Sequence, residues 1–324
     1  MGSIEDQERL AERYLSQNNK EAAVRLLFEL IVVCAKDRNF VKAEAIRDRI
    51  FEIDPMALEE IIRSGEIIER EKNESIDKGH REIWSKLYGL LGAEEATAFY
   101  FALENKSYDT DEVVYRQGEK NARLYFVNQG RLKIAFNQGG REVLLKSITA
   151  GQIAGEETFF VSSMCTTSMI ALSKVGLSCL DAACLARWET EFPLLTPKLV
   201  EFISGFEKTA DLIRTRGMDR RTHKRIPFSR DIVVQVFARS GKPVGRPFTG
   251  DICDLSPDGL CFSVKISKRE TANLLLGQRL GMSYTHPRAG SPAKVNKEGT
   301  IVAVRFHPLV ESSIHVKFDS VPTA

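Results

Sequence analysis

The sequence has no apolar stretch long enough to cross a membrane as a helix. Such a helix needs about 20 consecutive apolar residues, and the most apolar run, residues 26–35, is shorter and contains Glu29. The first residues, Met1 to Asp6, are acidic, whereas a signal peptide begins with a basic and then an apolar region. Both absences lead us to expect a cytoplasmic protein without a membrane span.

The sequence also has few of the patterns that enzymes and metal sites use. Its 6 cysteines include no C-x-x-C pair, and its 5 histidines include no H-E-x-x-H spacing, which argues against a zinc ribbon, a disulfide framework and a metal cofactor. Most of the cysteines are expected to be small buried apolar residues. Phosphate-loop, dinucleotide-binding and nucleophile-elbow motifs are missing too. We therefore expect a protein that is not an enzyme.

What the sequence does have is an ordinary globular composition with an uneven distribution of charge. Its 324 residues are 43% hydrophobic and 28% charged, which suits about two to three folded domains. Residues 1–75 carry a net charge of −5 and residues 76–213 carry −3, whereas residues 214–324 carry +10. A basic domain favours an anionic partner such as nucleic acid, a membrane surface or a phosphorylated small molecule. The alternative is that the opposite charges only help the domains to dock within the chain.

Residues 1–76 are expected to form a helical bundle. Apolar residues recur at helical spacing between Leu10 and Ile50, polar residues interrupt them twice, and Asp54-Pro55 marks the start of another helix. Residues 20–22 are similar to residues 41–43 at an offset of 21, which is weakly similar to tetratricopeptide-like helical hairpins. We expect an unidentified protein partner to bind this bundle.

Residues 77–217 are expected to form a β-roll followed by a long helix. From Glu112 onward, short apolar segments alternate with glycine-containing turns at roughly ten-residue spacing, which is typical of a roll or barrel. A helix over residues 199–213 is predicted from apolar residues with the spacing of two heptads: Leu199, Ile203, Phe206, Ala210 and Ile213. This seam either forms a homodimer or packs on its own β-roll, and we favour the homodimer.

Four strings in this region share a characteristic glycine spacing: residues 113–118, 124–134, 140–145 and 151–156. Together they resemble the cyclic nucleotide-binding domain of the catabolite-activator and protein-kinase regulatory family. The resemblance spans about residues 84–213. The family's bacterial transcription factors continue into a helix-turn-helix, whereas this chain returns to β structure, so we do not expect DNA binding of that kind.

The resemblance also implies that the nucleotide pocket is degenerate. In the family, a Gly-Glu pair supplies a glutamate for the ribose, and an arginine further on binds the cyclic phosphate. Here Gly155 and Glu156 are present, but Cys165 stands at the arginine position, and no Arg or Lys occurs between Gly155 and Lys174. A buried phosphate without a cation is poorly stabilised. We expect either an inert scaffold or a site for a less anionic ligand, and no binding of cyclic AMP.

Residues 218–324 are expected to form a six-stranded β-barrel, because alternating apolar residues recur between Gly, Pro and Asp. Two motifs lie in this region: R-x-x-x-R at Arg221 and Arg225, and D-x-S-x-x-G, which begins at Asp254. In this order and at this spacing they resemble the PilZ domain, a family that binds cyclic di-GMP. The overall fold class expected is therefore an α+β multidomain protein: helical bundle, cyclic-nucleotide-binding-like β-roll and PilZ barrel.

The resemblance implies a cyclic di-GMP site built around the two motifs. Arg221 and Arg225 are expected to hold guanine and phosphate, because a guanidinium plane donates paired hydrogen bonds and stacks on purines. Arg220, a long basic residue before the first motif arginine, implies that the ligand binds as a stacked dimer. Asp254 is expected to accept hydrogen bonds from guanine, and Ser256 to donate one to the ligand. Gly259 is expected to allow the ligand to approach the backbone closely.

These observations predict a cyclic di-GMP receptor that transmits binding to its other domains, with Gly217 as the hinge of the arginine-bearing arm. One alternative is a dual sensor that also binds a cyclic mononucleotide in the β-roll. A second is an interaction scaffold that binds no nucleotide. A third is nucleic-acid binding by the basic domain, which would favour clustered exposed aromatic residues. Phe228 and Phe237 instead lie within strand patterns.

Overall fold

A computed structural model describes residues 4–138, 140–217, 223–238, 240–266, 274–288, 291–307 and 311–319. The chain divides into two compact units, residues 1–103 with 188–199 and residues 104–187 with 200–324. The predicted domain boundaries at 76/77 and 217/218 fall inside these units and stay predictions. Within the described residues, no helix is both long and apolar enough to span a membrane.

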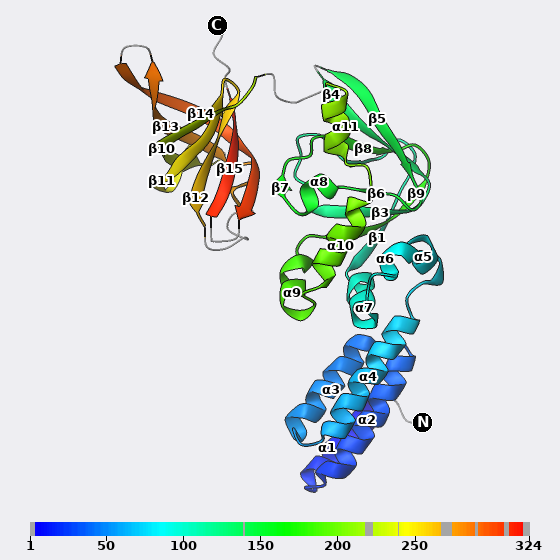
Figure 1. Cartoon of the computed structure of the whole chain (residues 1–324). Helices are drawn as coiled ribbons and strands as arrows, with labels where there is room; N and C mark the ends of the chain where they lie inside the picture. The colour runs from blue at the N-terminus through cyan, green and yellow to red at the C-terminus, as the bar shows by residue number, and fades with distance from the viewer. Residues whose placement is uncertain are drawn as a thin grey trace. The chain divides into compact units, whose positions relative to one another are not determined.

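The N-terminal unit begins with antiparallel helices packed side by side (Figure 1): α1 (Ile4–Ser16), α2 (Lys20–Lys36), α3 (Phe40–Ile53) and α4 (Leu58–Glu74). The predicted helical N-terminus is confirmed. Two of its turns have the same design, because Asn18 and Arg38 both adopt positive φ and the asparagine after each caps the next helix. The two turns are therefore 20 residues apart, whereas the similar sequence strings are 21 residues apart.

Short helices complete this unit: α5 (Lys78–Ile83), α6 (Ser85–Tyr88) and α7 (Ala93–Phe101). Part of α9 (Cys184–Glu191) and of α10 (Leu195–Ser204) belongs to the same unit. Lys198 Nζ lies 2.6 Å from Glu95 Oε2, which joins α10 to α7. Both tryptophans of the chain, Trp84 and Trp188, are buried in this unit.

The first part of the second unit is the predicted β-roll. Its strands are β1 (Leu103–Tyr108), β2 (Val113–Tyr115), β3 (Arg123–Gln129), β4 (Arg131–Gln138), β5 (Arg141–Thr149), β6 (Ile153–Ala154), β7 (Ser162–Ser163), β8 (Ser168–Ala171) and β9 (Val175–Asp181), with the short helix α8 (Glu156–Phe159). All of them except β7 form two sheets, ordered β1-β9-β3-β6 and β2-β8-β4-β5. Strand β7 instead pairs with β14 (Ser291–His307), which belongs to the next sheet along the chain. Apolar side chains from both sheets form the shared core.

The continuous helix predicted over residues 199–213 is wrong. Helix α10 ends at Ser204, and α11 (Thr209–Thr215) begins only after Lys208, whose backbone is extended with φ −74° and ψ 131°. Gly205, a poor helix former, follows the end of α10. Ile213 packs into the β-roll core. This contact fits the second interpretation of the seam, in which it packs on its own β-roll. The homodimer loses its continuous seam and stays a prediction.

The second part of this unit is a closed six-stranded antiparallel barrel, which confirms the predicted barrel fold. Its strands are β10 (Ile226–Phe237), β11 (Pro243–Ser256), β12 (Gly259–Lys265), β13 (Arg279–Arg288), β14 (Ser291–His307) and β15 (Glu311–Phe318). The order β13-β10-β11-β12-β15-β14 closes through pairing of β13 with β14 (Figure 1). Alternate residues of these strands form its core.

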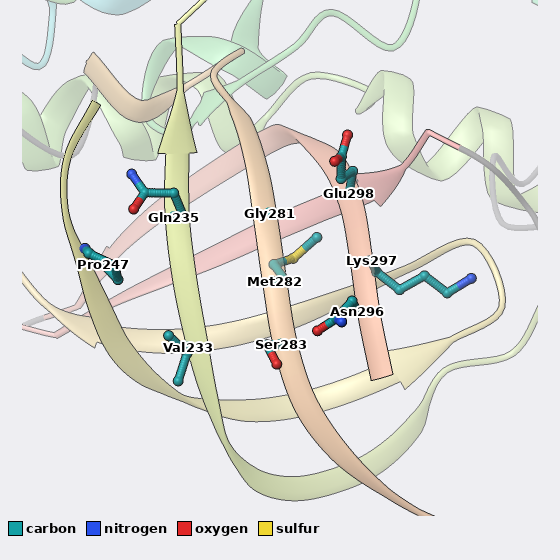
Figure 2. Close-up of a pocket in the computed structure, with 9 residues that line it drawn as sticks. All are labelled: Val233, Gln235, Pro247, Gly281, Met282, Ser283, Asn296, Lys297 and Glu298. Atoms are coloured by element: carbon teal, nitrogen blue, oxygen red, sulfur yellow. The ribbon is translucent and has the colours of Figure 1, made fainter. Parts of the chain in front are cut away.

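A shallow cavity of about 360 Å³ lies on the barrel, across β10, β13 and β14 (Figure 2). Val233, Gln235 and Ser283 contribute to its lining, with one cation and one anion, Lys297 and Glu298. This balanced lining has no preference for an anionic ligand. None of the predicted site residues that the structure describes takes part in this lining, so the cavity does not mark the predicted site.

Candidate functional site

Arg225 lies immediately before β10, and its side chain crosses the outer face of the barrel. Its Nη1 donates a hydrogen bond of 2.8 Å to Asp254 Oδ1 on β11 and lies 3.3 Å from His315 Nδ1 on β15. Strand register places Asp254 opposite Cys261 on β12, and Cys261 opposite His315. We call Arg225, Asp254, Cys261 and His315 the Arg225 cluster. It brings together residues that lie up to 90 positions apart.

The Arg225–Asp254 ion pair is partly buried, with 17% and 31% of the two side chains exposed. Charge-assisted hydrogen bonds are short and comparatively strong, so the pair fixes the direction of the guanidinium group. An arginine carries five N–H donors, and a carboxylate accepts on both oxygens. The pair therefore keeps capacity for a ligand that offers both acceptors and donors, as a guanine edge does.

Ser256 and Gly259 shape the hairpin between β11 and β12. Ser256 is only 8% exposed, and its Oγ donates a 3.1 Å hydrogen bond to the Gly259 carbonyl. A Cβ atom at Gly259 would lie 2.1 Å from the Val316 carbonyl oxygen of β15. The close backbone approach at Gly259 is thus to a neighbouring strand. The Ser256 hydroxyl already donates within the turn. A contact between Ser256 and a ligand stays a prediction.

The segment that leads to the cluster begins at α11. Gly217 follows this helix with φ +64°, and a Cβ atom there would meet nothing within 4 Å. Arg220 and Arg221, both predicted ligand contacts, lie outside the described residues. Beyond them, His223 Nδ1 is 2.9 Å from Asp258 Oδ2 in the β11–β12 turn.

In the β-roll, the predicted nucleotide pocket is engaged by the chain itself. Gly155 has φ +87°, and a Cβ atom there would lie 2.3 Å from the Arg123 carbonyl oxygen, so the position requires glycine. Glu156 Oε1 accepts hydrogen bonds from the Thr209 backbone N–H at 3.0 Å and from the Thr209 hydroxyl at 2.8 Å. The glutamate that a ribose would need therefore holds the first residue of α11.

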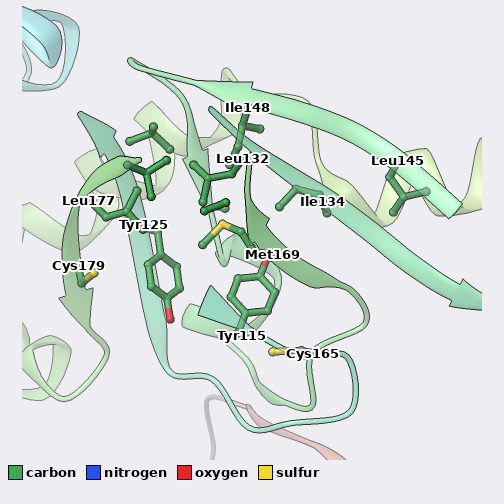
Figure 3. Close-up of a cluster of buried hydrophobic side chains, with 14 of the residues drawn as sticks. Tyr115, Tyr125, Leu132, Ile134, Leu145, Ile148, Cys165, Met169, Leu177 and Cys179 are labelled. Atoms are coloured by element: carbon green, nitrogen blue, oxygen red, sulfur yellow. The ribbon is translucent and has the colours of Figure 1, made fainter. Parts of the chain in front are cut away.

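Cys165 lies inside the β-roll core beside Tyr115 and Met169 (Figure 3). Only 2% of its surface is exposed, and burial, together with the nearby negative charge of Glu157, raises the pKa of its thiol to about 12. Thr166 and Thr167 donate their hydroxyl hydrogens to Glu157. A neutral thiol beside a carboxylate offers no positive charge to a phosphate. That the pocket is degenerate stays a prediction.

The cyclic nucleotide-binding domain family matches residues 105–188. The middle of the chain is thus a cyclic nucleotide-binding domain, while the N-terminal helices and the barrel lie outside this match. No curated protein matches the chain.

Several solved structures are similar to part of the chain. The N-terminal domain of a transcriptional regulator from Streptomyces coelicolor A3(2) shares 22% identity, covering 41% of this chain and 90% of that one, with a TM-score of 0.34. A cyclic nucleotide-binding domain from Methylobacillus flagellatus shares 17%, covering 46% and 80%, with a TM-score of 0.36. The c-di-GMP responsive global regulator CLP of Xanthomonas campestris shares 21%, covering 40% and 64%, with a TM-score of 0.34. These values carry no conclusion about the ligand of this chain.

Two residues of these sites were missed by the sequence analysis. His315 has no recognisable sequence signal, because its approach to Arg225 depends on the register of β12 and β15. Thr209 could have been found, because a threonine before an apolar helical segment is a common helix start. Its bond to Glu156 has no local signal in the sequence. Among the described residues, no group of three or more His, Cys, Asp or Glu side chains is placed to hold a metal ion.

Proposed function

We propose that the chain is a receptor for cyclic di-GMP and that the barrel binds this ligand in the manner of a PilZ domain. One observation carries the proposal. Arg225 of the R-x-x-x-R motif and Asp254 of the D-x-S-x-x-G motif, 29 residues apart, meet at 2.8 Å on the outer face of the barrel. Two sequence motifs predicted to share a ligand thus supply a cation and an anion at one place.

The chemistry of the ligand suits this arrangement. Cyclic di-GMP carries two phosphodiester charges and two guanines, and guanine offers N7 and O6 as acceptors to an arginine. Asp254 would accept from guanine N1–H and N2–H, while Arg225 would donate to N7 and O6 or to a phosphate. The net charge of +10 over residues 214–324 favours the approach of such an anion. In this proposal Arg220 and Arg221 complete the site, and Arg220 admits a stacked ligand dimer.

The cyclic nucleotide-binding domain at residues 105–188 supports a role in cyclic-nucleotide sensing and signalling. A second candidate function is therefore the binding of a cyclic mononucleotide in the β-roll, and the family match favours it. Two observations weigh against it: Glu156 is bonded to Thr209, and Cys165 supplies no charge. We propose that the β-roll and α11 transmit the signal from the barrel to a partner.

Isothermal titration calorimetry of the full chain with cyclic di-GMP, cyclic AMP and cyclic GMP tests this function. We expect binding of cyclic di-GMP alone. Arg225→Ala should weaken it about ten- to a hundredfold, because a charge-assisted hydrogen bond contributes about 1.5–3 kcal/mol. The matched control is Arg230→Ala, which removes an exposed arginine of β10, the strand that follows Arg225; this chain should bind like the parent.

Two results would contradict the proposal. One is unchanged affinity of the Arg225→Ala chain for cyclic di-GMP, which would place the ligand elsewhere. The other is micromolar binding of cyclic AMP that is lost on changing Glu156, which would assign nucleotide sensing to the β-roll. Two ligand molecules per chain would support a stacked dimer.

The partner is proposed to bind the N-terminal helices. Around the turn between α3 and α4, large apolar side chains are exposed, including Phe51 (56%), Met56 (79%) and Ile62 (59%). Over residues 51–66 there are five acidic side chains and one basic side chain. An apolar patch with an acidic surround suits a partner that is apolar and basic.

A further inference from the structure

Two thiols lie together on the outer face of the barrel, beside the Arg225 cluster. Cys253 is on β11 and Cys261 on β12, and these strands are antiparallel neighbours. The register pairs Ile252 with Phe262 and then Asp254 with Cys261. Cys253 is therefore the extra residue of a β-bulge and shares with Asp254 the position opposite Cys261.

The side chain of Cys261 points away from the barrel interior. Leu260 and Phe262, on either side of it, are both part of the barrel core, and successive side chains of a strand point to opposite faces. Nevertheless only 4% of Cys261 is exposed. The residue is thus buried on the outer face, among the side chains of the cluster.

The two thiols differ in their surroundings. The Cys253 thiol donates to the Asp251 carbonyl oxygen at 3.6 Å. Burial raises the pKa of the Cys261 thiol to about 12, and the neighbouring Cys253 and Asp254 act in the same direction. Cys261 Sγ also lies 3.9 Å from His315 Nε2. Both cysteines are free thiols, and Cys253 is exposed to solvent.

This placement suits a disulfide. Residues directly opposite each other in an antiparallel pair have Cα atoms about 4.5–5.5 Å apart, and a disulfide requires a Cα separation of about 4.4–6.8 Å. A soluble oxidant reaches the exposed thiol of Cys253 first, and the buried thiol of Cys261 lies on the neighbouring strand beside it. A low-molecular-weight oxidant therefore meets an attacking and a resolving thiol in one place.

We propose that Cys253 and Cys261 are a reversible redox pair that hydrogen peroxide converts to a cross-strand disulfide. The Cys253 sulfur attacks one peroxide oxygen and the O–O bond breaks, giving a sulfenic acid and water. The Cys261 sulfur then displaces the hydroxyl group, forming the S–S bond and releasing a second water. The thiols lose two protons and two electrons, and the peroxide takes them up and is reduced to two waters. A small dithiol reverses the step by exchange.

The same disulfide is placed to weaken ligand capture, an inference that rests on the proposed function. Asp254 adjoins Cys253 in the chain and faces Cys261 across the strands. We expect that drawing the two sulfurs to the disulfide bond length of about 2.0 Å shifts the bulge that carries Asp254. The Arg225–Asp254 pair and the contact of Cys261 with His315 then change together.

Peptide mapping of the full chain tests the disulfide. Trypsin should release both cysteines in one peptide, residues 240–265, because prolines follow Lys242 and Arg246 and no other Lys or Arg intervenes. After peroxide treatment and alkylation in denaturant, we expect this peptide without alkyl groups and lighter by two hydrogens. In the Cys253→Ser chain the link should be absent. Two alkyl groups on this peptide, under peroxide that fully oxidises a free model thiol, would overturn the proposal, as would links between chains only.

Calorimetry with cyclic di-GMP tests the coupling. We expect at least tenfold weaker binding by the oxidised parent, full recovery with dithiothreitol, and no effect of peroxide on the Cys253→Ser chain. Equal affinity of the oxidised and reduced parent, with the disulfide mapped, would overturn the coupling. If neither form binds, the proposed function fails, whereas the mapped disulfide stands by itself.

Discussion

The neighbouring strand leaves no room for a side chain at Gly259. A Cβ atom there would lie 2.1 Å from the Val316 carbonyl oxygen, a backbone atom of the neighbouring strand. We expect Gly259→Ala to destabilise the barrel by about 1–3 kcal/mol through overpacking. Amide exchange of β12 and β15, followed by mass spectrometry, should become faster.

The matched control for this change is Gly176→Ala. Gly176 is also a strand glycine, but the nearest atom to its added Cβ would be Gln129 Cβ at 3.8 Å, an ordinary contact. Its exchange should stay close to that of the parent. Equal amide exchange of β12 in the Gly259→Ala and parent chains would contradict the prediction. It would show that β12 and β15 accommodate the added methyl group without a loss of stability.

His80 is a buried histidine of the N-terminal unit. It is 7% exposed, lies among aromatic rings and shares a 3.1 Å hydrogen bond with Tyr88 Oη. Burial lowers its pKa from 6.5 to about 4, so the folded unit holds it neutral. Below pH 6.5 the unfolded chain gains a proton that the folded chain does not. Stability is therefore lost as the pH falls from about 6.5 to about 4, by roughly 3 kcal/mol in total.

Tryptophan fluorescence measures this effect, because both tryptophans are buried in the same unit as His80. Between pH 7 and pH 4.5, we expect the free energy of unfolding in denaturant to fall more for the parent than for a His80→Phe chain. His223→Gln, a histidine outside this unit, should follow the parent. Parallel pH profiles of the parent and the His80→Phe chain would contradict the assignment.

At the scale of elements, α11 depends on the β-roll. It has seven residues, and helices this short are marginal in isolation. Its stability comes from the burial of Ile213 in the β-roll core and from Glu156, which accepts hydrogen bonds at its first residue. The carboxylate also lies at the positive end of the helix dipole.

We expect Glu156→Ala to loosen α11. The loss of a helix cap costs about 1 kcal/mol, so amide exchange over residues 209–215 should become about fivefold faster. Glu207→Ala removes an exposed carboxylate close to the same helix and should leave this exchange unchanged. Equal exchange in all three chains would mean that burial of Ile213 holds α11 without the glutamate.

At the scale of the whole molecule, the segment from α11 to Arg225 connects the β-roll with the cluster. Gly217, with φ +64°, ends α11. Contacts between the ligand and this segment would fix its backbone, and the ligand can shift the arrangement of the domains only by the difference of its affinities for the two states. We therefore expect cyclic di-GMP to slow amide exchange between Arg214 and Arg225 and to change the solution scattering profile.

The control for this prediction is the Arg225→Ala chain at the same ligand concentration, which should show neither change. Parent scattering and exchange that both stay constant at saturating ligand would rule out the segment as the switch.

The sequence by itself determined the features that depend on neighbouring residues. The helix starts at Asn19 and Asn39 follow from side chains that cap the backbone three residues ahead. The β-roll corners follow from glycines at positive φ, such as Gly155. The alternation of apolar residues was enough to predict the barrel, because a strand buries every second side chain.

Only the tertiary structure decided which distant residues meet. The spacing of apolar residues predicted one helix over residues 199–213, but Glu156, 53 positions before Thr209, starts a new helix there. The motifs predicted Arg225 and Asp254, whereas His315 and the thiol pair depend on strand register and on one bulge. Local patterns record which face of an element is apolar. They do not record how two strands are aligned, and a shift of one residue would turn Cys261 from the cluster to the core.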